Sequence, residues 1–177
     1  GINLKNFSPY LGDKFSNNQI HKIINKEYFK NLLKKENISI SRIGDQRLHS
    51  ESDLLEKVCK AIIKGKVIGW FYGRMEWGPR ALGHRSILGD PRRIDMKKIL
   101  NNKIKRRESF RPFAPSVLEE YVEDWFQITS NSDISVPYMM KVYKFKSEKQ
   151  ELVPAVCHVD GSGRLQSVNE KMNERYY

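Results

Sequence analysis

The sequence predicts one α+β domain in which helices flank a twisted sheet of mixed or mainly antiparallel strands. The chain has 177 residues, a length that suits one domain. Hydrophobic residues make up 39% of it and aromatic residues 11%, which is enough to build a core. Segments with apolar residues at helical spacing alternate with short strand-like runs, and the sequence has no internal repeat.

The first predicted element is a helix that begins after Ser16. Ser16 and Gln19 have the spacing of a capping box, in which each side chain bonds the backbone of the other residue. Apolar residues follow at helical spacing as far as Leu33, and the polar run 34–37 ends the helix. The next run, 38–43 (ISISRI), alternates apolar and polar residues and predicts a short half-buried strand.

A second helix is expected over residues 52–64, since apolar residues recur on one face and Gly65 follows where a C-cap glycine belongs. The run 66–72 (KVIGWFY) is almost entirely apolar, which predicts a buried strand. Residues 86–88 predict another short strand. A helix is expected over 92–103, with three apolar side chains facing inward, those of Ile94, Ile99 and Leu100.

The last third of the chain is predicted to hold strands with short connections. Its predicted elements are, in order, an extended segment at 112–118, a short helix at 119–127, a strand at 138–145, a polar turn at 146–150, a strand at 152–159 paired with the previous one, a turn at 160–163 (DGSG) and a strand at 164–168. This mixture of helices and paired strands leads to the α+β class.

Basic residues are concentrated between Gly73 and Arg111. This 39-residue segment holds twelve Lys or Arg and four acids, a net charge of +8 out of +11 for the chain. Glycines and prolines break its first half into turns, so its arginines can converge on one point. Convergent guanidinium groups favour an anion, and phosphate suits their planar fork best. The segment therefore predicts a phosphate-binding site.

The first half of this segment contains the sequence GPRALGHR, in which glycines and a proline surround Arg80. Arg80 and Arg85 lie five positions apart across a turn and could grip one oxyanion. For an arbitrary chain, a plain surface loop is the commoner outcome of such a pattern. Neither a phosphate-loop signature nor a dinucleotide fingerprint occurs, so side chains must build any phosphate site.

The second half ends in another cluster of charges. If the chain is extended there, Lys105, Arg107 and Arg111 point to one face. Ser109 lies on the same face, and three cations with a hydroxyl suit a triphosphate. Glu108 would point the other way and hold the array through an internal ion pair. The alternative is a solvated basic face, which is the usual fate of a charge run.

Histidines and cysteines give weaker indications. His84 is the histidine expected to lie nearest a ligand, and the strand-end position of His158 fits a binding role and a structural role equally well. No His, Cys or carboxylate set has metal-ligand spacing, and no Ser–His–Asp triad is indicated. Cys59 and Cys157 are predicted to be buried, as small hydrophobic residues in a reducing compartment, so a cytoplasmic location is expected.

Three stretches of the chain resemble one known family. GRMEWGPRALGHRSILGDPR, KIKRRESFRPFAPSVLEE and HVDGSGRLQSV are similar, in this order, to the C-terminal region of O-carbamoyltransferases of the NodU, CmcH and TobZ type. These are nodulation and antibiotic-tailoring enzymes. The opening sequence SPYLG and the run 66–72 match as well, so the resemblance spans nearly the whole chain.

The resemblance implies a YrdC-like α+β domain that uses ATP and carbamoyl phosphate, with Mg²⁺ accompanying the nucleotide, to form a carbamoyl-adenylate. It implies that residues 1–16 are a linker from an N-terminal transferase domain. Residues 17–177 would be the C-terminal YrdC-like domain, incomplete at its C-terminal end because relatives continue with an LNTSFN-like motif. The transferase domain, which holds its own metal ion, would pass the carbamoyl group to a hydroxyl of a small molecule. The isolated piece is expected to be inactive.

Carried over by position, the resemblance assigns roles to two groups of residues. Catalytic roles fall to Arg80, Arg85, Lys105 and Arg107. Binding of the nucleotide and of carbamoyl phosphate falls to Arg74, Ser86, Glu108, Arg111, His158, Asp160 and Arg164, and no residue of this chain is assigned to a metal. His84 stands where many relatives have asparagine, so its imidazole is not expected to act in catalysis.

Two other functions stay open. The net charge of +11 and the aromatic residues near the basic segment permit an RNA-binding module. Nucleic acid is the less expected partner, because the cations lie among Gly, Pro and apolar residues rather than along one helix. The other function is docking on the transferase domain, and apolar surface near Tyr177 would let the isolated piece form a homodimer. Neither a signal peptide nor a membrane span is predicted, and the sequence does not indicate the carbamoyl acceptor.

Overall fold

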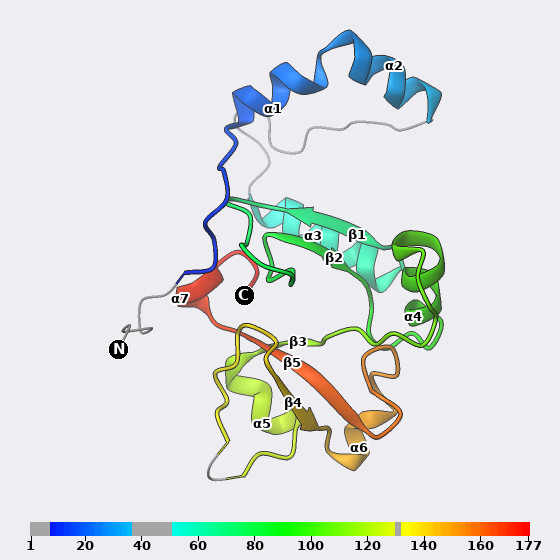
Figure 1. Cartoon of the computed structure of the whole chain (residues 1–177), viewed down its shortest axis with the longest axis vertical. Helices are drawn as coiled ribbons and strands as arrows, with labels where there is room; N and C mark the ends of the chain where they lie inside the picture. The colour runs from blue at the N-terminus through cyan, green and yellow to red at the C-terminus, as the bar shows by residue number, and fades with distance from the viewer. Residues whose placement is uncertain (1–7, 37–50, 130–131) are drawn as a thin grey trace.

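The computed structural model describes residues 8–36, 51–129 and 132–177 (Figure 1). Helices and two small sheets make up these segments, which confirms the predicted α+β class. The helical elements are, in chain order, α1 (Asn17–Ile24), α2 (Glu27–Lys35), α3 (Glu51–Ile63), α4 (Met96–Ile99), the π-helix η2 (Leu100–Lys105), the 3-10 helix η3 (Glu119–Tyr121), α5 (Val122–Trp125), α6 (Ser147–Gln150) and α7 (Glu170–Asn173). Within the described ranges, no helix combines the length and the apolar character needed to cross a lipid bilayer.

The strands form one antiparallel and one mixed sheet. In the first sheet, β1 (Ile68–Phe71) pairs antiparallel with β2 (Arg85–Leu88). In the second, β5 (Ser162–Val168) is the central strand. It runs parallel to β3 (Ser116–Leu118) on one side and antiparallel to β4 (Lys141–Lys144) on the other. Figure 1 shows α3 and α4 beside the first sheet, and α5 and α6 beside the second.

The N-terminal helical segment differs from the prediction in one respect. The capping box is confirmed, with the side chains of Ser16 and Gln19 each bonded to the other's backbone. Instead of one helix there are two, because Asn25 ends α1 and the extended backbone of Lys26 precedes α2. Asparagine favours helix ends, where its side chain competes for backbone hydrogen bonds. Neither helix has a buried residue, and both extend away from the sheets (Figure 1). The strand predicted at 38–43 lies outside the described residues.

The helix C-cap predicted at Gly65 is confirmed. Gly65 has a φ of +75°, and the N–H of Lys66 donates to the carbonyl of Ala61 at 2.9 Å, as in a Schellman motif. Burial of Cys59, in contrast, was a wrong prediction, because its side chain is exposed on α3. The helix packs on the β1–β2 sheet, and a sheet of two short strands offers too little apolar surface to cover a whole helical face.

The predicted strand within 66–72 is confirmed as β1, but its burial is not. Residues of β1 are alternately half-buried and exposed, and 53% of the surface of Phe71 is accessible. Successive side chains of a strand point to opposite faces of the sheet, so this alternation shows that one face of β1 is better covered than the other. The strand predicted at 86–88 is confirmed as β2, which begins one residue earlier, at Arg85.

The helix predicted over 92–103 begins later than expected. Ile94 lies in the preceding turns and is 84% exposed, so its predicted inward position is wrong. Met96, the first residue of α4, is buried instead, which shifts the phase of the apolar face. Leu100 is buried as predicted and Ile99 is partly buried. At Leu100 the helix widens into the π-helix η2.

The predicted pairing of 138–145 with 152–159 is wrong. β4 pairs with β5, while 152–159 forms successive turns in which Cys157 is partly buried. Pro154 explains this difference, because it lacks the N–H that a central position in a β-ladder needs. The polar turn predicted at 146–150 is the short helix α6.

The main core surrounds β5. Phe126 and Phe145 stack there with ring centroids 4.3 Å apart, and their side chains are 0% and 1% exposed. Leu165, on β5 itself, is also fully buried. The predicted extended segment around β3 is confirmed, and the short helix predicted at 119–127 is found as η3 followed by α5. The turn predicted at 160–163 is shorter than expected, because the last strand is confirmed but already begins at Ser162. This packing fixes β5, which carries Arg164 to the candidate site.

Candidate anion-binding site

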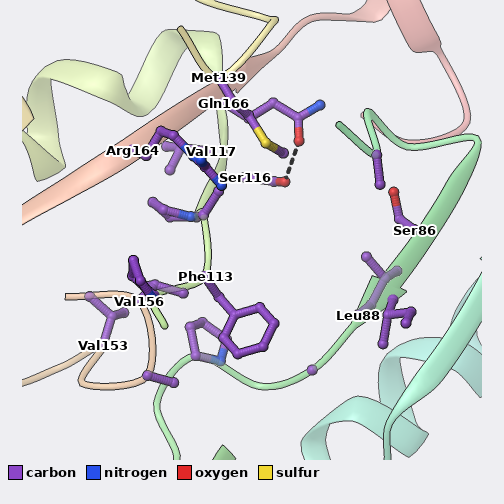
Figure 2. Close-up of a pocket in the computed structure, with 18 of the residues that line it drawn as sticks. Ser86, Leu88, Phe113, Ser116, Val117, Met139, Val153, Val156, Arg164 and Gln166 are labelled. Carbon is purple, nitrogen blue, oxygen red and sulfur yellow. Dashed lines mark hydrogen bonds between the residues drawn. The ribbon is translucent and has the colours of Figure 1, made fainter. Parts of the chain in front are cut away.

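A cavity of about 660 Å³ is lined by residues of both sheets. Figure 2 shows Ser86 and Leu88 of β2 on one side, and Val117 of β3 with Arg164 of β5 on the other. The ring of Phe113 lies between them (Figure 2). A cavity of this size suits a small-molecule ligand.

The charged residues that line the cavity are all cations. They include no Asp or Glu from the described ranges and comprise Arg80, Arg92, Lys105, Arg107 and Arg164. Arg92 is already paired, since it forms two hydrogen bonds of 2.7–2.8 Å with the buried carboxylate of Asp90. The side chains of Arg80 and Lys105 form no hydrogen bond or ion pair with the described part of the chain, so their charges remain available to a ligand.

Arg164 gives the clearest evidence that the positive charge of the cavity is not neutralised by nearby acids. Burial lowers the pKa of its guanidinium, and the like charges of Arg80 and Arg107 lower that pKa further. Its Nε atom is buried and has no hydrogen-bond partner among the described residues. An anion bound at Arg164 would offset the repulsion from these two like charges.

The rest of the cavity wall is largely apolar. Phe113, Val153 and Val156 lie together at one side (Figure 2), and Met96 and Leu100 also contribute to the wall. The guanidinium carbon of Arg107 lies 4.9 Å from the centroid of the Phe113 ring. The cavity therefore joins an apolar wall to a cationic group, an arrangement that suits an amphipathic phosphorylated ligand.

Glu76 holds the loop that carries Arg80. Its carboxylate is buried, and Oε1 accepts hydrogen bonds from the backbone N–H groups of Leu82 (2.6 Å), His84 (2.7 Å) and Arg85 (3.2 Å). Burial alone would raise the pKa of Glu76, but these hydrogen bonds, that from His84 first, lower it below its usual value. Sequence reasoning counted Glu76 only as a charge, although an acid between two glycine turns is a signal for such an anchor.

Arg85 and Arg74 lie away from the cavity. Arg85 Nε lies 3.1 Å from Glu76 Oε2, and its terminal nitrogen donates to the carbonyl of Gly78. Arg74 donates to the carbonyl of Gly12 at 3.3 Å. The structure thus does not bring Arg85 and Arg80 together on one cavity wall.

Ser86 does line the cavity, as the next residue on β2. Its hydroxyl accepts from the N–H of Gly83 at 2.9 Å, and its residue is 7% exposed. Alternation along the strand separates Ser86 from Arg85, because successive side chains point to opposite faces. Arg85 is accordingly exposed where Ser86 is buried.

The second predicted cluster, which consists of Lys105, Arg107, Glu108 and Arg111, is also only partly in the cavity. Lys105 and Arg107 line the cavity, while Arg111 and Glu108 form an exposed ion pair of 2.9 Å outside it. The extended chain expected here is wrong: Lys105 ends the π-helix, and Arg106 has the left-handed values φ 49° and ψ 55°. These two turns separate the cations that an extended strand would have aligned. The internal ion pair of Glu108 is confirmed.

Asn101 is a residue that sequence reasoning missed. It is fully buried, and its Oδ1 accepts from Arg107 Nε at 2.7 Å. Its Nδ2 donates to the carbonyls of Ser109 (3.1 Å) and Arg111 (2.9 Å). The available signal was its spacing: Asn101 lies seven positions after Ile94, a spacing that puts both residues on one face of a helix.

His158 and Asp160 stabilise the turn that precedes β5 through hydrogen bonds, and they do not line the cavity. His158 Nδ1 lies 2.9 Å from the hydroxyl of Ser162, which donates to Asp160 Oδ1 at 2.6 Å. Hydrogen bonds from Ser162 and Lys144 hold the pKa of Asp160 well below its usual value. Burial lowers the pKa of His158. Across the described ranges, no three His, Cys, Asp or Glu side chains form a group suited to a metal ion.

His84 also lies outside the cavity lining. Its ring stacks on Tyr10 with centroids 3.7 Å apart, and its Nδ1 lies 2.6 Å from the carbonyl of Arg74. The imidazole therefore ties the N-terminal segment to the Arg80 loop.

Tyr176 also lines the cavity. Its hydroxyl lies 2.8 Å from that of Ser116, and burial raises its pKa. Its ring packs so closely on Gly83 that a Cβ atom at Gly83 would lie 2.6 Å from the Tyr176 Cδ1 atom. The first predicted motif is thus held in place by a residue more than ninety positions later in the chain.

Comparison with known families identifies one match. The family described as "Carbamoyltransferase C-terminus" matches residues 59–177, which include every residue that lines the cavity.

Three relatives illustrate the similarity. An uncharacterized protein of Synechocystis sp. is 42% identical over 95% of this chain and 28% of its own length. Nodulation protein NolNO of Sinorhizobium fredii is 45% identical over 71% of this chain and 18% of its own. Nodulation protein NolO of Bradyrhizobium diazoefficiens is 41% identical over 76% of this chain and 24% of its own. The chain thus spans between 18% and 28% of the length of these relatives.

Proposed function

The chain belongs to the carbamoyltransferase C-terminus family, and we propose that its cavity binds ATP and carbamoyl phosphate in the formation of a carbamoyl-adenylate. The carbamoyl group would then pass to a hydroxyl of a small molecule in an N-terminal transferase domain of the same polypeptide. The observation that carries this proposal is the group formed by Arg80, Arg107 and Arg164, which have no acid beside them on the cavity wall.

The proposed reaction develops negative charge, which Arg80, Arg107 and Arg164 would stabilise. Carbamate, formed with inorganic phosphate when water cleaves carbamoyl phosphate, would attack the α-phosphorus of ATP through an oxygen, and pyrophosphate would leave. Negative charge grows on the phosphate oxygens during this substitution. Fixed guanidinium groups stabilise such charge and align the reactants without reorganising. We assign this work to Arg80, Arg107 and Arg164, with Lys105 at the rim.

The apolar wall supports the assignment of a nucleotide rather than a bare inorganic anion. Phe113 and the valines beside it offer a surface for the flat adenine ring, while the cations would take the phosphates. Mg²⁺ would arrive with the nucleotide and be held by its phosphates, because no carboxylate of the described residues lines the cavity. A cavity that combines cations with an apolar wall favours a small anion over RNA, for which an exposed cationic surface is typical.

Binding experiments test the proposal. Isothermal titration of the protein with ATP–Mg²⁺ and with carbamoyl phosphate should give saturable binding. Arg80→Ala should weaken ATP binding about tenfold or more, since hydrogen bonds to charged groups contribute about 1.5–3 kcal/mol. Arg93→Ala is the matched control, because Arg93 is an exposed arginine of the same segment that pairs with Asp95.

Two outcomes would overturn the proposal. One is equal ATP affinity of the full-length polypeptide that contains this chain and of its Arg80→Ala variant, with unchanged production of carbamoyl-adenylate measured by mass spectrometry. The other is absence of ATP binding together with tight, steeply salt-dependent binding of RNA, which would favour a nucleic-acid-binding module.

A further inference from the structure

We propose that Asn101 is a positioning residue for Arg107, which it holds in the orientation that a phosphate group needs. This role rests on the proposed function, because it takes Arg107 to be one of the phosphate ligands. Asn101 itself contributes no atom to the cavity lining. It acts from the buried side of η2, where it forms the second residue of the π-helix.

Asn101 uses its whole side-chain amide. The carbonyl oxygen Oδ1 accepts from Arg107 Nε at 2.7 Å, and the amide nitrogen Nδ2 donates to the carbonyls of Ser109 and Arg111 at 3.1 and 2.9 Å. The backbone carbonyl of Asn101 also accepts from the N–H of Arg107 at 3.0 Å. The residue is 0% exposed, so these bonds do not compete with water.

These contacts leave one edge of the Arg107 guanidinium free. Its Nε is bound to Asn101, and its plane lies near the Phe113 ring, 4.9 Å from the guanidinium carbon to the ring centroid. Its terminal nitrogens form no hydrogen bond with the described part of the chain. A guanidinium held at Nε and on one side can present its two terminal N–H groups to an oxyanion with little loss of side-chain entropy.

No other side chain of similar size supplies the same set of bonds. Aspartate could accept from Arg107 but could not donate to the two carbonyls, and leucine could do neither. The chain around Asn101 is also unusual, since a π-helix runs into the left-handed Arg106. Single-turn π-helices often occur at functional sites. Here the wide turn and the left-handed residue return the chain, so that Arg107 lies beside Asn101.

A double-mutant cycle separates this role from a general structural one. Titration with ATP–Mg²⁺ compares the wild-type protein, Asn101→Ala, Arg107→Ala and the double variant. Asn101→Ala should weaken ATP binding about tenfold in the wild-type background and have no further effect when Arg107 is already alanine. Asn102→Ala is the matched control, because Asn102 is the exposed neighbour on the same helix. Equal losses in both backgrounds, or no loss at all, would overturn the role of Asn101.

A second measurement needs no change at Asn101. The Arg107 Nε–H signal in a nitrogen-15 spectrum, assigned with Arg107→Ala, should exchange slowly with water. The Nε–H of exposed Arg106 should exchange much faster. Equal exchange rates of the Arg106 and Arg107 Nε–H groups would contradict the proposed contact between Asn101 and Arg107. Because this comparison requires no ligand, it tests the role of Asn101 even if the wild-type protein binds no ATP, the result that would instead contradict the proposed function.

Discussion

Glu76 lies buried against Arg85, with its Oε2 atom 3.1 Å from Arg85 Nε, while its other oxygen accepts three backbone N–H groups. The pair shows that two arginines of one loop have different roles. Arg85 stabilises the loop, and Arg80, at the centre of the same loop, is left to face the cavity. Arg85, which the sequence suggests as a ligand-binding residue, thus has a structural role beside the site.

Replacing Glu76 with glutamine should lower the free energy of unfolding at pH 7 by about 2–4 kcal/mol, because a buried charged partner is lost. Hydrogen bonds lower the pKa of Glu76 in the folded state. Its contribution is therefore complete above its ordinary pKa of 4.5 and is lost as the pH falls through the lower folded-state value. Urea unfolding at several pH values should show wild type and variant converging in acid.

The control for this comparison is Glu56→Gln, which removes an exposed carboxylate from an i,i+4 pair with Lys60. That change should alter stability by at most about 0.5 kcal/mol. If Glu76→Gln lost the same amount at every pH, the ionised carboxylate would not be the stabilising species.

Inorganic phosphate should raise the melting temperature of the protein, because it would bind the folded cavity and not the unfolded chain. At a phosphate concentration about 100 times its Kd, the stabilisation would be about 2.7 kcal/mol. Arg164→Gln should lose most of this effect. It should itself cost little stability without phosphate, since burial among Arg80 and Arg107 already disfavours the charge of Arg164.

Differential scanning calorimetry with and without phosphate measures both effects. Arg93→Gln, which changes an exposed arginine paired with Asp95, should keep the full response to phosphate. A phosphate response of Arg164→Gln equal to that of the wild type would remove Arg164 from the anion site.

Gly83→Ala should destabilise the protein more than Gly78→Ala. Both glycines have positive φ, +103° and +112°, so each substitution carries a backbone penalty of about 1–2 kcal/mol. At Gly78 no atom lies within 4 Å of the new Cβ, whereas at Gly83 the ring of Tyr176 lies at 2.6 Å. The clash should add about 1–3 kcal/mol. Equal losses in urea unfolding would show that Tyr176 moves aside freely.

Phe126→Ala should cost about 3–5 kcal/mol of stability, since Phe126 is fully buried and stacks on Phe145. Phe110→Ala removes a ring of the same size that is 74% exposed and should change stability by less than about 0.5 kcal/mol. The two chemical denaturation midpoints give the comparison. Similar midpoints would mean that the packing around β5 contributes little to stability.

Local signals in the sequence predicted the local structure well. The capping box at Ser16 and the glycine at Gly65 set helix ends through nearby hydrogen bonds, and both are confirmed. Strand pairing was harder to predict, because it depends on contacts between distant segments. The partner of β4 is β5 rather than 152–159, and Pro154, which excludes that run from a ladder, carried the missed signal.

The candidate site was only partly predictable for the same reason. The basic composition of Gly73–Arg111 indicated an anion, and Arg80, Lys105 and Arg107 do line the cavity. Arg164 joins them only through the pairing of β3 with β5. Arg85 was expected in the site, but it occupies the exposed face of β2. Arg111 was expected in the site on the assumption of an extended chain, but the chain turns at Arg106.

The pairing of β3 with β5 also decides when the site can exist. Ser116 lies opposite Gln166, fifty residues later, and Tyr176 also lines the cavity. A ribosome adding about 5–20 residues per second therefore releases Arg80 and Arg107 seconds before Arg164 and Tyr176 can join them. During that interval the nascent chain exposes a basic segment without its binding pocket. Ligand cannot assist folding until the last strand has been made, so early steps depend on local contacts such as those of Glu76 and Asn101.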